Sequence, residues 1–407
     1  MKVISRNTYL DKIRPFIDVP IIKVITGIRR CGKSFLFIQI INELLNNGIK
    51  QNQIHLLNMD DLENIGLLDG ESLYSHISPM MKDQGKHYIF IDEVQNVSEW
   101  ERAINSLLLK GNVDIYISGS NSNLLSSELT TFIAGRYVSI CMETLSFSEF
   151  IEFRREFTSF DGDGKTLLND YIRRGGFPII STKNFDITSS DNLIKDIFDA
   201  IVYKDTIARN NIRNGKQLEI FLKFMLDNVG NPFSARSISR AFSNNGINFS
   251  PITVLKYLDY LERSYLLRKV QRYDIRGKRI IASEDKYYVS DVSLIYALNG
   301  YEEGMISGIE ENIVYLELLR RGYSTYVGRT RDMRGIDFIG EKDGRRIYVQ
   351  VTHTIESAET ARREFSPFDS VPDNFPKYVV VANNKWDVED VGIIQIGLAE
   401  FLLLESY

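Results

Sequence analysis

Residues 27–34 read Gly27-Ile28-Arg29-Arg30-Cys31-Gly32-Lys33-Ser34 and fit the pattern G-x-x-x-x-G-K-[ST] without a mismatch. Glycines in such a loop let backbone N–H groups turn inward around phosphates, and the following helix points its positive end at them. An apolar run, Ile21–Thr26, precedes the loop, and an amphipathic stretch follows from Phe35. We therefore expect the amides of residues 27–35 to bind the phosphates of ATP, with Lys33 at the β- and γ-phosphates. The Ser34 hydroxyl is the expected ligand of Mg²⁺.

A second apolar run, His87–Asp92, ends in two acids, Asp92 and Glu93. We expect Asp92 to hold Mg²⁺ through its water shell, and Glu93 to orient and polarise the attacking water. A strand that ends in two acids is often only a solvated strand end. Because this one comes after a phosphate-binding loop, the catalytic interpretation is favoured.

The run Val113–Ser118 leads into Gly119-Ser120-Asn121-Ser122. In P-loop proteins with a catalytic glutamate after the acidic strand, an extra strand lies between the loop strand and the acidic strand. Its tip carries a polar side chain that senses the γ-phosphate, a role open to Ser120 or Asn121. The alternative is a polar turn that caps the next helix.

Apolar runs and helical patterns alternate through residues 1–145, which is typical of an α/β core with a parallel sheet wrapped by helices. The expected strands are Ile21–Thr26, Gln53–Asn58, His87–Asp92, Val113–Ser118 and Tyr137–Met142, and the expected helices are Lys33–Asn46, Ser98–Lys110 and a short one after Asn121. Residues 146–215 predict a helical lid interrupted at Gly175-Gly176-Phe177-Pro178. Residues 293–407 predict a small α/β domain.

Three helical patterns and a hairpin indicate a winged helix-turn-helix over residues 216–292. The helices are expected at Lys216–Asn228, at Ser234–Phe242 and from Ser250-Pro251 through Leu267, and the hairpin strands at Val270–Arg276 and Arg279–Ser283. Ser250 suits a helix cap and Pro251 the first helical position.

The composition indicates a soluble, multidomain globular protein. The chain has 407 residues, 43% of them hydrophobic, with a formal net charge of −5. We expect no membrane span and no signal peptide, and therefore a cytoplasmic location. Two cysteines, Cys31 and Cys141, and four histidines predict neither a disulfide framework nor a zinc site.

The chain resembles a bacterial and archaeal family of AAA-like P-loop ATPases, related to STAND ATPases, whose members carry a C-terminal domain of unknown function. The motifs that carry the resemblance are T-G-I-R-R-C-G-K-S (26–34), I-D-E-V-Q-N-V-S-E-W-E-R-A-I (91–104), S-G-S-N-S-N-L-L (118–125), A-G-R-Y (134–137), L-S-F-S-E-F (145–150), G-G-F-P (175–178) and E-N-I-V-Y-L-E-L-L-R-R-G (311–322).

The resemblance implies roles for three further segments. Arg136 looks like a catalytic arginine that senses or stabilises the γ-phosphate, in its own subunit or a neighbour's. The alternative is a surface arginine beside a strand. Gly176-Phe177-Pro178 looks like the Gly-x-Pro turn that links nucleotide state to the next domain in STAND ATPases, and residues 145–150 look like a packing motif of the lid.

Residues 231–290 contain 11 Lys and Arg against 5 Asp and Glu, a local charge of +6 (11 − 5). Basic residues gather at the end of the third helix and in the hairpin, namely Arg263, Arg268, Lys269, Arg272, Arg276, Lys278 and Arg279. In a DNA-binding winged helix these parts face the groove, so phosphate contact is reasonable. In STAND-like ATPases, however, the winged helix commonly folds back on the nucleotide domain, and this alternative is favoured.

Residues 293–407 match the outline of a restriction-endonuclease-like, PD-(D/E)xK fold. Glu311 and Glu317 lie on a helix and Asp337 lies on a strand, but the E-x-K position reads Gln350-Val351-Thr352. The metal would lose a carboxylate and the lysine is missing, so we expect a nuclease-like domain without its chemistry. Asn384-Lys385-Trp386-Asp387 fits the guanine-reading pattern N-K-x-D, but it lies too far from the phosphate loop to serve it.

The function that the sequence predicts best is Mg²⁺-dependent ATP hydrolysis that drives a conformational switch of the winged helix and the C-terminal domain. The alternative is a nucleotide-gated regulator or scaffold that binds DNA or protein and turns over little ATP. The sequence leaves open a DNA partner, a protein partner and a homo-oligomer.

Overall fold

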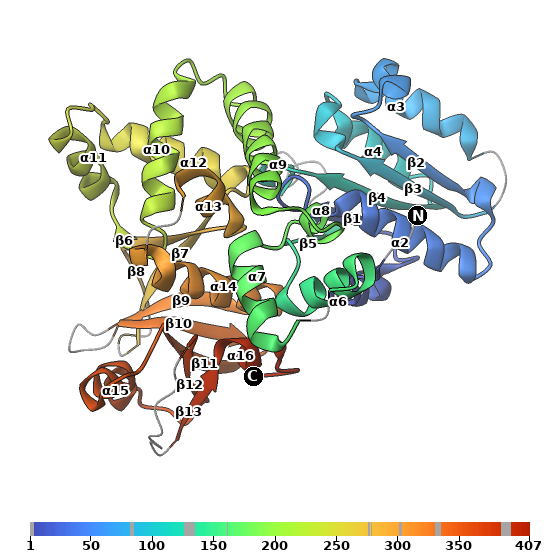
Figure 1. The fold of residues 1–407 in the computed structure, drawn as a ribbon. Helices are drawn as coiled ribbons and strands as arrows, with labels where there is room; N and C mark the ends of the chain where they lie inside the picture. The colour runs from blue at the N-terminus through green and yellow to red at the C-terminus, as the bar shows by residue number, and fades with distance from the viewer. Residues whose placement is uncertain are drawn as a thin grey trace. The chain divides into compact units, whose positions relative to one another are not determined.

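The computed structural model describes residues 4–81, 85–125, 135–160, 162–275, 277, 279–300, 303–329, 335–383 and 392–407. Contacts divide the chain into two compact units, residues 1–143 with 263–265, and residues 144–262 with 266–407 (Figure 1). Within the described ranges, no helix combines the length and the apolar character that crossing a membrane requires.

The first unit contains a five-stranded parallel sheet with the order β2-β3-β4-β1-β5. The strands are β1 (Ile22–Thr26), β2 (Ile54–Asn58), β3 (His87–Asp92), β4 (Val113–Gly119) and β5 (Tyr137–Cys141). All five were predicted to within one residue at each end. The extra strand expected between the loop strand and the acidic strand is β4, which pairs with both β1 and β3.

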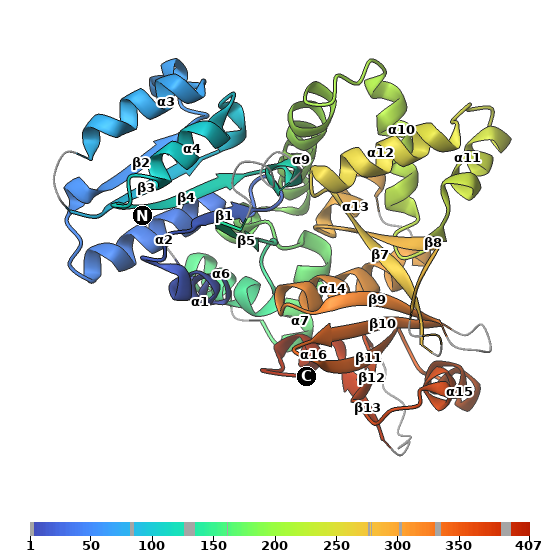
Figure 2. The ribbon, with the colours of Figure 1, turned by 180° about the vertical axis from the view of Figure 1, so that it is seen from behind.

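Helices cover both faces of this sheet, α1 and α2 on one face and α3 and α4 on the other (Figures 1 and 2). They are α1 (Asn7–Ile13), α2 (Lys33–Asn46), α3 (Gly70–Ile77) and α4 (Trp100–Leu108). Every residue of β1, β3 and β4 is buried, as expected for parallel strands covered on both faces. The prediction for α2 is confirmed, whereas α4 is shorter than the predicted helix Ser98–Lys110, and α1 and α3 were not predicted.

The second unit starts with a series of helices. A helical segment was predicted for residues 146–215. The helices are α6 (Phe147–Thr158), α7 (Gly164–Arg174), α8 (Pro178–Ser181), α9 (Ile187–Ala200), a π-helix (Ile201–Ala208), α10 (Gly215–Asp227), α11 (Ala235–Asn244) and α12 (Pro251–Arg263). The hydroxyl of Ser250 accepts a hydrogen bond from the Thr253 amide at 3.1 Å, which confirms the cap predicted for α12. The helix ends earlier than predicted, before Leu267.

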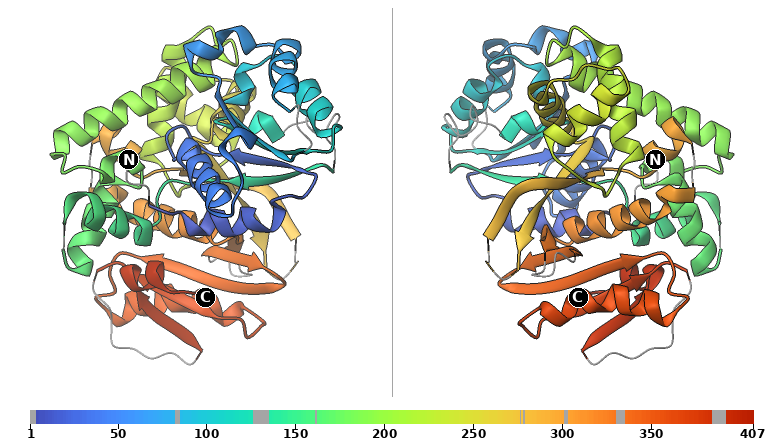
Figure 3. Two further views of the ribbon diagram at one scale, coloured as in Figure 1. Left: turned by 90° about the vertical axis from the view of Figure 1, so that its right-hand side faces the viewer. Right: turned by 90° about the vertical axis from the view of Figure 1, so that its left-hand side faces the viewer.

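An eight-stranded sheet with the order β13-β12-β11-β10-β9-β7-β8-β6 completes the second unit. Its strands are β6 (Pro232–Phe233), β7 (Leu267–Asp274), β8 (Arg279–Val289), β9 (Ser324–Arg329), β10 (Gly335–Lys342), β11 (Arg345–Thr352), β12 (Lys377–Val381) and β13 (Ile393–Gly397). Figure 3 shows them from both sides, coloured from yellow to red along the chain. The remaining helices are α13 (Ser293–Asn299), α14 (Ile306–Arg320), α15 (Ala358–Phe365) and α16 (Leu398–Leu403).

The hairpin β7–β8 therefore shares a sheet with the C-terminal strands, because β7 also pairs in parallel with β9. Sequence reasoning ended the second hairpin strand at Ser283, and this is wrong, since β8 continues to Val289. The polar run Glu284-Asp285-Lys286 hid the continuation, although Lys286 pairs with Val270 across the hairpin. The sequence did not predict that the hairpin joins the C-terminal strands.

The Gly175-Gly176 turn is held by two residues from elsewhere in the chain, Asp291 and Leu145. Gly176 donates its amide to Asp291 at 2.8 Å and accepts a hydrogen bond from the Leu145 amide at 2.7 Å. Gly175 has φ +68°, and a Cβ there would lie 1.9 Å from the Asp291 carboxylate, so only glycine fits. The buried Asp291 thus ties the turn to the start of α13, and the turn itself is tied to the residues that come after β5.

Candidate functional site

The loop between β1 and α2 contains two glycines that no other residue can replace without strain. Gly27 has φ +145°, and a Cβ on it would lie 2.1 Å from the Met142 carbonyl oxygen. Gly32 has φ +109° at the start of α2. The first glycine allows close approach of the chain after β5, and the second allows the turn into the helix. This is the backbone geometry that the sequence pattern requires.

Lys33, the first residue of α2, is 5% exposed and its ammonium group lies within the loop. Its Nζ donates to the carbonyl oxygens of Gly27 at 3.2 Å and of Ile28 at 3.3 Å. The Glu93 carboxylate lies 3.8 Å from the same nitrogen. The ammonium group is therefore held by weak, long contacts that phosphate oxygens can replace.

Ser34 and Asp92 are in direct contact. Ser34 Oγ donates to Asp92 Oδ2 at 2.5 Å, and Ser118 Oγ donates to the other carboxylate oxygen. Asp92 is buried at the end of β3, next to β4, which supplies Ser118. A hydroxyl and a carboxylate are the oxygen donors with which Mg²⁺ is usually held beside phosphates, so these residues fit that ion.

Glu93 comes directly after Asp92 with φ +55°, in the left-handed region that non-glycine residues rarely adopt. Its carboxylate accepts hydrogen bonds from Ser120 Oγ at 3.2 Å and from the Gln95 side-chain amide. Its amide donates to Ser118 at 3.3 Å. Backbone strain of this kind is found at functional sites, where the surrounding contacts keep it in place.

The other predicted loop residues differ in their surroundings. Ile28 and Cys31 are fully buried, and burial raises the pKa of the Cys31 thiol, so this cysteine stays protonated. Arg29 lies 3.7 Å from the Asp60 carboxylate, while Arg30 and Phe35 are exposed. Of these five residues, only the two exposed ones leave their side chains at the surface of the loop.

Arg6 was missed by sequence reasoning. This buried side chain donates from Nη1 to the Cys31 carbonyl at 2.9 Å and to the Glu143 carbonyl at 3.0 Å. It therefore ties the phosphate loop to the residues after β5. A single arginine before a short helix carries no recognisable pattern, so no sequence signal identified it. Ser118 and Gln95 were also missed, although both lie inside segments that carry the family resemblance.

Arg136 is not brought together with the other predicted residues. Its carbonyl accepts the Ile22 amide at 2.8 Å, which places it where β1 and β5 begin, while the phosphate loop comes after the end of β1. Five strand residues separate the two ends by roughly 16 Å. Its guanidinium group donates to Asn105 at 3.3 Å. This position does not support an action of Arg136 on the nucleotide of its own chain.

The C-terminal carboxylates form a cluster with a lysine that no sequence pattern placed there. Lys286 of β8 lies 2.5 Å from Glu311 and 3.3 Å from Asp337. Glu317 lies apart and pairs with Arg320 and Arg321. Further hydrogen bonds surround the cluster. The Tyr288 hydroxyl donates to Glu311, the Val351 amide to Asp337 at 3.0 Å, the Asp337 amide to Gln350 at 3.3 Å, and Gln350 to Glu364 at 3.0 Å.

The polar side chains of the cluster are engaged with one another within the protein. Gln350 uses both ends of its amide within the protein, and Lys286 places a cation between the two acids. Across the described ranges, no three His, Cys, Asp or Glu side chains are grouped so that they could hold a metal ion. The segments Asn384–Asp387 and the positions Ala134, Arg276 and Lys278 lie outside the described residues.

Comparisons with known proteins agree with the geometry of the first unit. Residues 20–151 match the family described as AAA domain, and residues 165–304 match a domain of unknown function (DUF8612). The Walker-type ATPase PABY2304 of Pyrococcus abyssi shares the fold with a TM-score of 0.52 at 14% identity, over 73% of this chain and 96% of that one.

Two relatives extend over most of the chain. An uncharacterized protein of Haemophilus influenzae is 36% identical over 405 residues, which are 98% of this chain and 99% of that protein. The uncharacterized protein MJ1544 of Methanocaldococcus jannaschii is 31% identical over 311 residues, 74% of this chain and 67% of that protein. The chain therefore belongs to one family with the Haemophilus influenzae protein, and its N-terminal part is an AAA domain with the fold of the P-loop ATPases.

Proposed function

We propose that the chain binds ATP with Mg²⁺ at the loop 27–35 and hydrolyses it. The observation that carries this proposal is the contact between Ser34 and Asp92, because it joins the expected metal ligands from two separate elements. Glu93, the expected base, lies next to them and 3.8 Å from the Lys33 ammonium group. Phosphate, metal and water would thus meet at one edge of the parallel sheet, where α/β proteins bind their ligands.

Each residue has a distinct task in this proposal. The amides of residues 27–35 bind the β-phosphate, and Lys33 exchanges its loop carbonyls for phosphate oxygens. Ser34 ligates Mg²⁺, and Asp92 holds it through water; when bound, the ion neutralises charge that develops on the phosphates. Glu93 orients the attacking water and accepts its proton. Ser120 and Gln95 keep the Glu93 carboxylate in position by donating hydrogen bonds to it.

We infer that the nucleotide state reaches the second unit through residues 142–145. The Met142 amide donates to the Thr26 carbonyl at 2.7 Å, immediately before the phosphate loop. Three residues later, the Leu145 amide donates to Gly176, which is bound to Asp291. A shift of the loop would act on the Gly176 turn through these four residues. The arrangement supports the expected role of Gly176-Phe177-Pro178 as a link to the following domain.

The alternative, a nucleotide-gated regulator, needs an output surface. The three helices α10–α12 and the hairpin β7–β8 have the element order of a winged helix. Of the hairpin's basic residues, Lys269 pairs with Asp285 at 2.9 Å and Arg272 with Glu284 at 2.8 Å. Helix α12 instead exposes Ile252 and Leu255, at 67% and 58%. Paired cations and exposed apolar side chains favour a protein partner over DNA for this surface.

The experiment that tests the proposal is a titration of the full-length chain with a non-hydrolysable ATP analogue and Mg²⁺, together with an ATPase assay. Wild type should bind the analogue and hydrolyse ATP. Lys33→Ala should lose at least about 1.4 kcal/mol of binding free energy, a tenfold change in affinity, because its ammonium group contacts the phosphates. The control is Lys50→Ala, an exposed lysine beyond the end of α2. Equal affinity of the two variants, or no binding by wild type, would contradict the proposal.

A further inference from the structure

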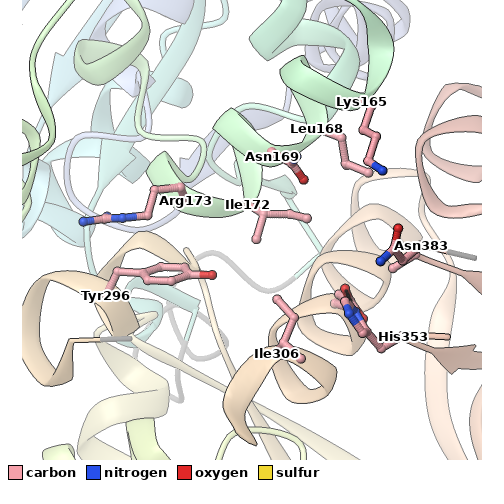
Figure 4. Close-up of a pocket in the computed structure, with 11 residues that line it drawn as sticks. Lys165, Leu168, Asn169, Ile172, Arg173, Tyr296, Ile306, His353 and Asn383 are labelled. Carbon is pink, nitrogen blue, oxygen red and sulfur yellow. Dashed lines mark hydrogen bonds and ion pairs between the residues drawn. The ribbon is translucent and has the colours of Figure 1, made fainter. Parts of the chain in front are cut away.

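A cavity of about 500 Å³ lies within the second unit and shares no residue with the proposed ATP site. It is bordered by α7, α13, α14 and the residues that come after β11 and β12 (Figure 4). The polar side chains that line it include Lys165, Asn169, Tyr296, Glu310, His353 and Asn383. We call this the α7–α14 pocket. Its volume is in the range of small-molecule sites.

A buried carboxylate forms part of its wall. Glu310 of α14 is 1% exposed, and its Oε1 lies 2.7 Å from Nδ1 of His353. Its second oxygen, Oε2, is buried and has no hydrogen-bond partner among the residues that the structure describes. A buried carboxylate oxygen without a partner costs about 1–3 kcal/mol or more. The cost is removed if a bound molecule donates a hydrogen bond to it.

Hydrogen-bond donors gather at the mouth of the same pocket. The side chains of Lys165, Asn169 and Asn383 are exposed, and none has a side-chain hydrogen bond or ion pair within the described part of the chain. Figure 4 shows Lys165, Asn383 and His353 at one end of the cavity. His353 is 41% exposed, and its Nδ1 is engaged by Glu310, so Nε2 is the ring nitrogen left for a ligand. The donors of Asn169, Asn383 and His353 lie around the ammonium group of Lys165. This arrangement favours a ligand with an oxyanion.

The other end of the pocket is apolar and pre-formed. Ile172 and Tyr296 are buried there, with Ile306 beside them (Figure 4). Arg173 does not add a charge, because Asp191 binds its guanidinium group at 2.9 and 2.6 Å and the group stacks 4.9 Å from the Tyr296 ring centre. The tyrosine ring is therefore held in place, and a flat apolar group fits against it.

We propose that the α7–α14 pocket binds a phosphate monoester with a planar, apolar body. The phosphate lies at Lys165, Asn383 and His353, and the body lies against Tyr296 and Ile172. The second pKa of a phosphate monoester lies at about 6, so below this pH most of the ester keeps one hydroxyl, and this hydroxyl is the donor that Glu310 Oε2 lacks. A carboxylate offers no such proton. Lys165, the lysine among these side chains, matches the single charge that the ester carries below this pKa.

The proposal is tested by titrating phenyl phosphate into the full-length chain by calorimetry at about pH 5.5, below the second pKa of the ester. The Lys33→Ala substitution is present throughout, so that binding at the phosphate loop does not contribute and the result does not depend on the ATPase proposal. We expect phenyl phosphate to bind at least tenfold more tightly than either inorganic phosphate or benzoate. The first comparison tests the apolar body and the second tests the acidic hydroxyl.

Substitutions then locate the site. Lys165→Met should weaken phenyl phosphate binding about tenfold, whereas Lys195→Met, an exposed lysine on α9, should leave it unchanged. Glu310→Gln should remove the preference for phenyl phosphate over benzoate. If this buried substitution prevents folding, the surface substitution Lys165→Met still tests whether phenyl phosphate binds at this pocket. Absence of phenyl phosphate binding, or equal affinity in Lys165→Met and Lys195→Met, would overturn the proposal.

Discussion

Ser34 Oγ and Asp92 Oδ2 are joined by a hydrogen bond of 2.5 Å, although the two residues are 58 positions apart in the chain. One belongs to the first turn of α2 and the other to the last position of β3. The same carboxylate is held on its other oxygen by Ser118 of β4. One carboxylate thus joins helix α2 with strands β3 and β4, and Ser34 and Asp92 are the residues that would hold Mg²⁺.

This contact predicts a specific defect in metal dependence. Asp92→Asn should raise the Mg²⁺ concentration needed for half-maximal ATP hydrolysis at least tenfold, because the amide carries no charge to hold the ion's water shell. The measurement is ATPase rate against Mg²⁺ concentration. Asp60→Asn serves as the control, since Asp60 also borders the loop, but its carboxylate contacts Arg29 at 3.7 Å and Asn96 at 2.9 Å instead of Ser34. An unchanged Mg²⁺ requirement in Asp92→Asn would remove this residue from the metal site.

Glu93→Gln should separate binding from hydrolysis. The amide keeps the size and the hydrogen-bonding oxygen of the side chain but cannot accept a proton, so turnover should fall by about 10²–10⁴-fold while analogue binding stays within a few-fold of wild type. Single-turnover ATP hydrolysis and a binding titration measure the two effects. Glu99→Gln, an exposed acid that pairs with Arg102 on the same segment, is the control.

Two other outcomes of this experiment carry information. Equal hydrolysis rates in wild type and Glu93→Gln would exclude Glu93 as the base. If both proteins bind the analogue and neither hydrolyses ATP, the nucleotide-gated regulator is the better description.

The parts of the fold and of the site that could be predicted best are those marked by a contiguous sequence pattern. The loop 27–34 and the acidic strand end are contiguous patterns, so their elements and their mutual approach could be predicted from spacing and parallel-sheet topology. Contacts that depend on one residue from a distant element could not. Arg6 reaches the Cys31 carbonyl from before α1, and Lys286 reaches Glu311 from a strand whose second half is polar in sequence. Neither residue has a local pattern that marks its partner.

The cluster of Lys286, Glu311 and Asp337 predicts a pH-dependent loss of stability. Burial and the neighbouring Asp337 raise the pKa of Glu311 to about 7, and Lys286 opposes this rise. Lys286→Met removes the only cation that contacts either acid in the described cluster, so the free energy of unfolding should fall by about 3–5 kcal/mol at pH 8, above the pKa of Glu311.

The sign of the pH dependence is set by the direction of the shift. A carboxyl group whose pKa is higher in the folded than in the unfolded protein binds a proton on folding, so stability is lost as pH rises. The difference in unfolding free energy between wild type and Lys286→Met should therefore become smaller as pH falls from 8 to 5. Thermal unfolding midpoints of wild type and variant across this range measure it, with Lys195→Met as the control. A deficit that is the same at every pH would show that the lysine acts through packing alone.

The buried pair in the first unit predicts non-additive effects on stability. Lys23 of β1 and Asp114 of β4 form an ion pair and are both 0% exposed. Asp114 also accepts hydrogen bonds from the Asp18 amide at 3.0 Å and from Tyr116 at 2.8 Å. Lys23→Met alone leaves a buried carboxylate without its cation, which should cost about 3–5 kcal/mol of unfolding free energy.

Adding Asp114→Asn to Lys23→Met should recover more than half of that loss, because the amide oxygen keeps both hydrogen bonds while the uncompensated charge disappears. Chemical denaturation of wild type, the two single variants and the double variant completes the cycle. Because the chain has two compact units, denaturation can show two transitions. The unfolding free energies to compare are those of the transition that the single variants shift. If the two losses simply add, the pair is not energetically coupled, and the strand contact between β1 and β4 would owe its stability to its apolar residues.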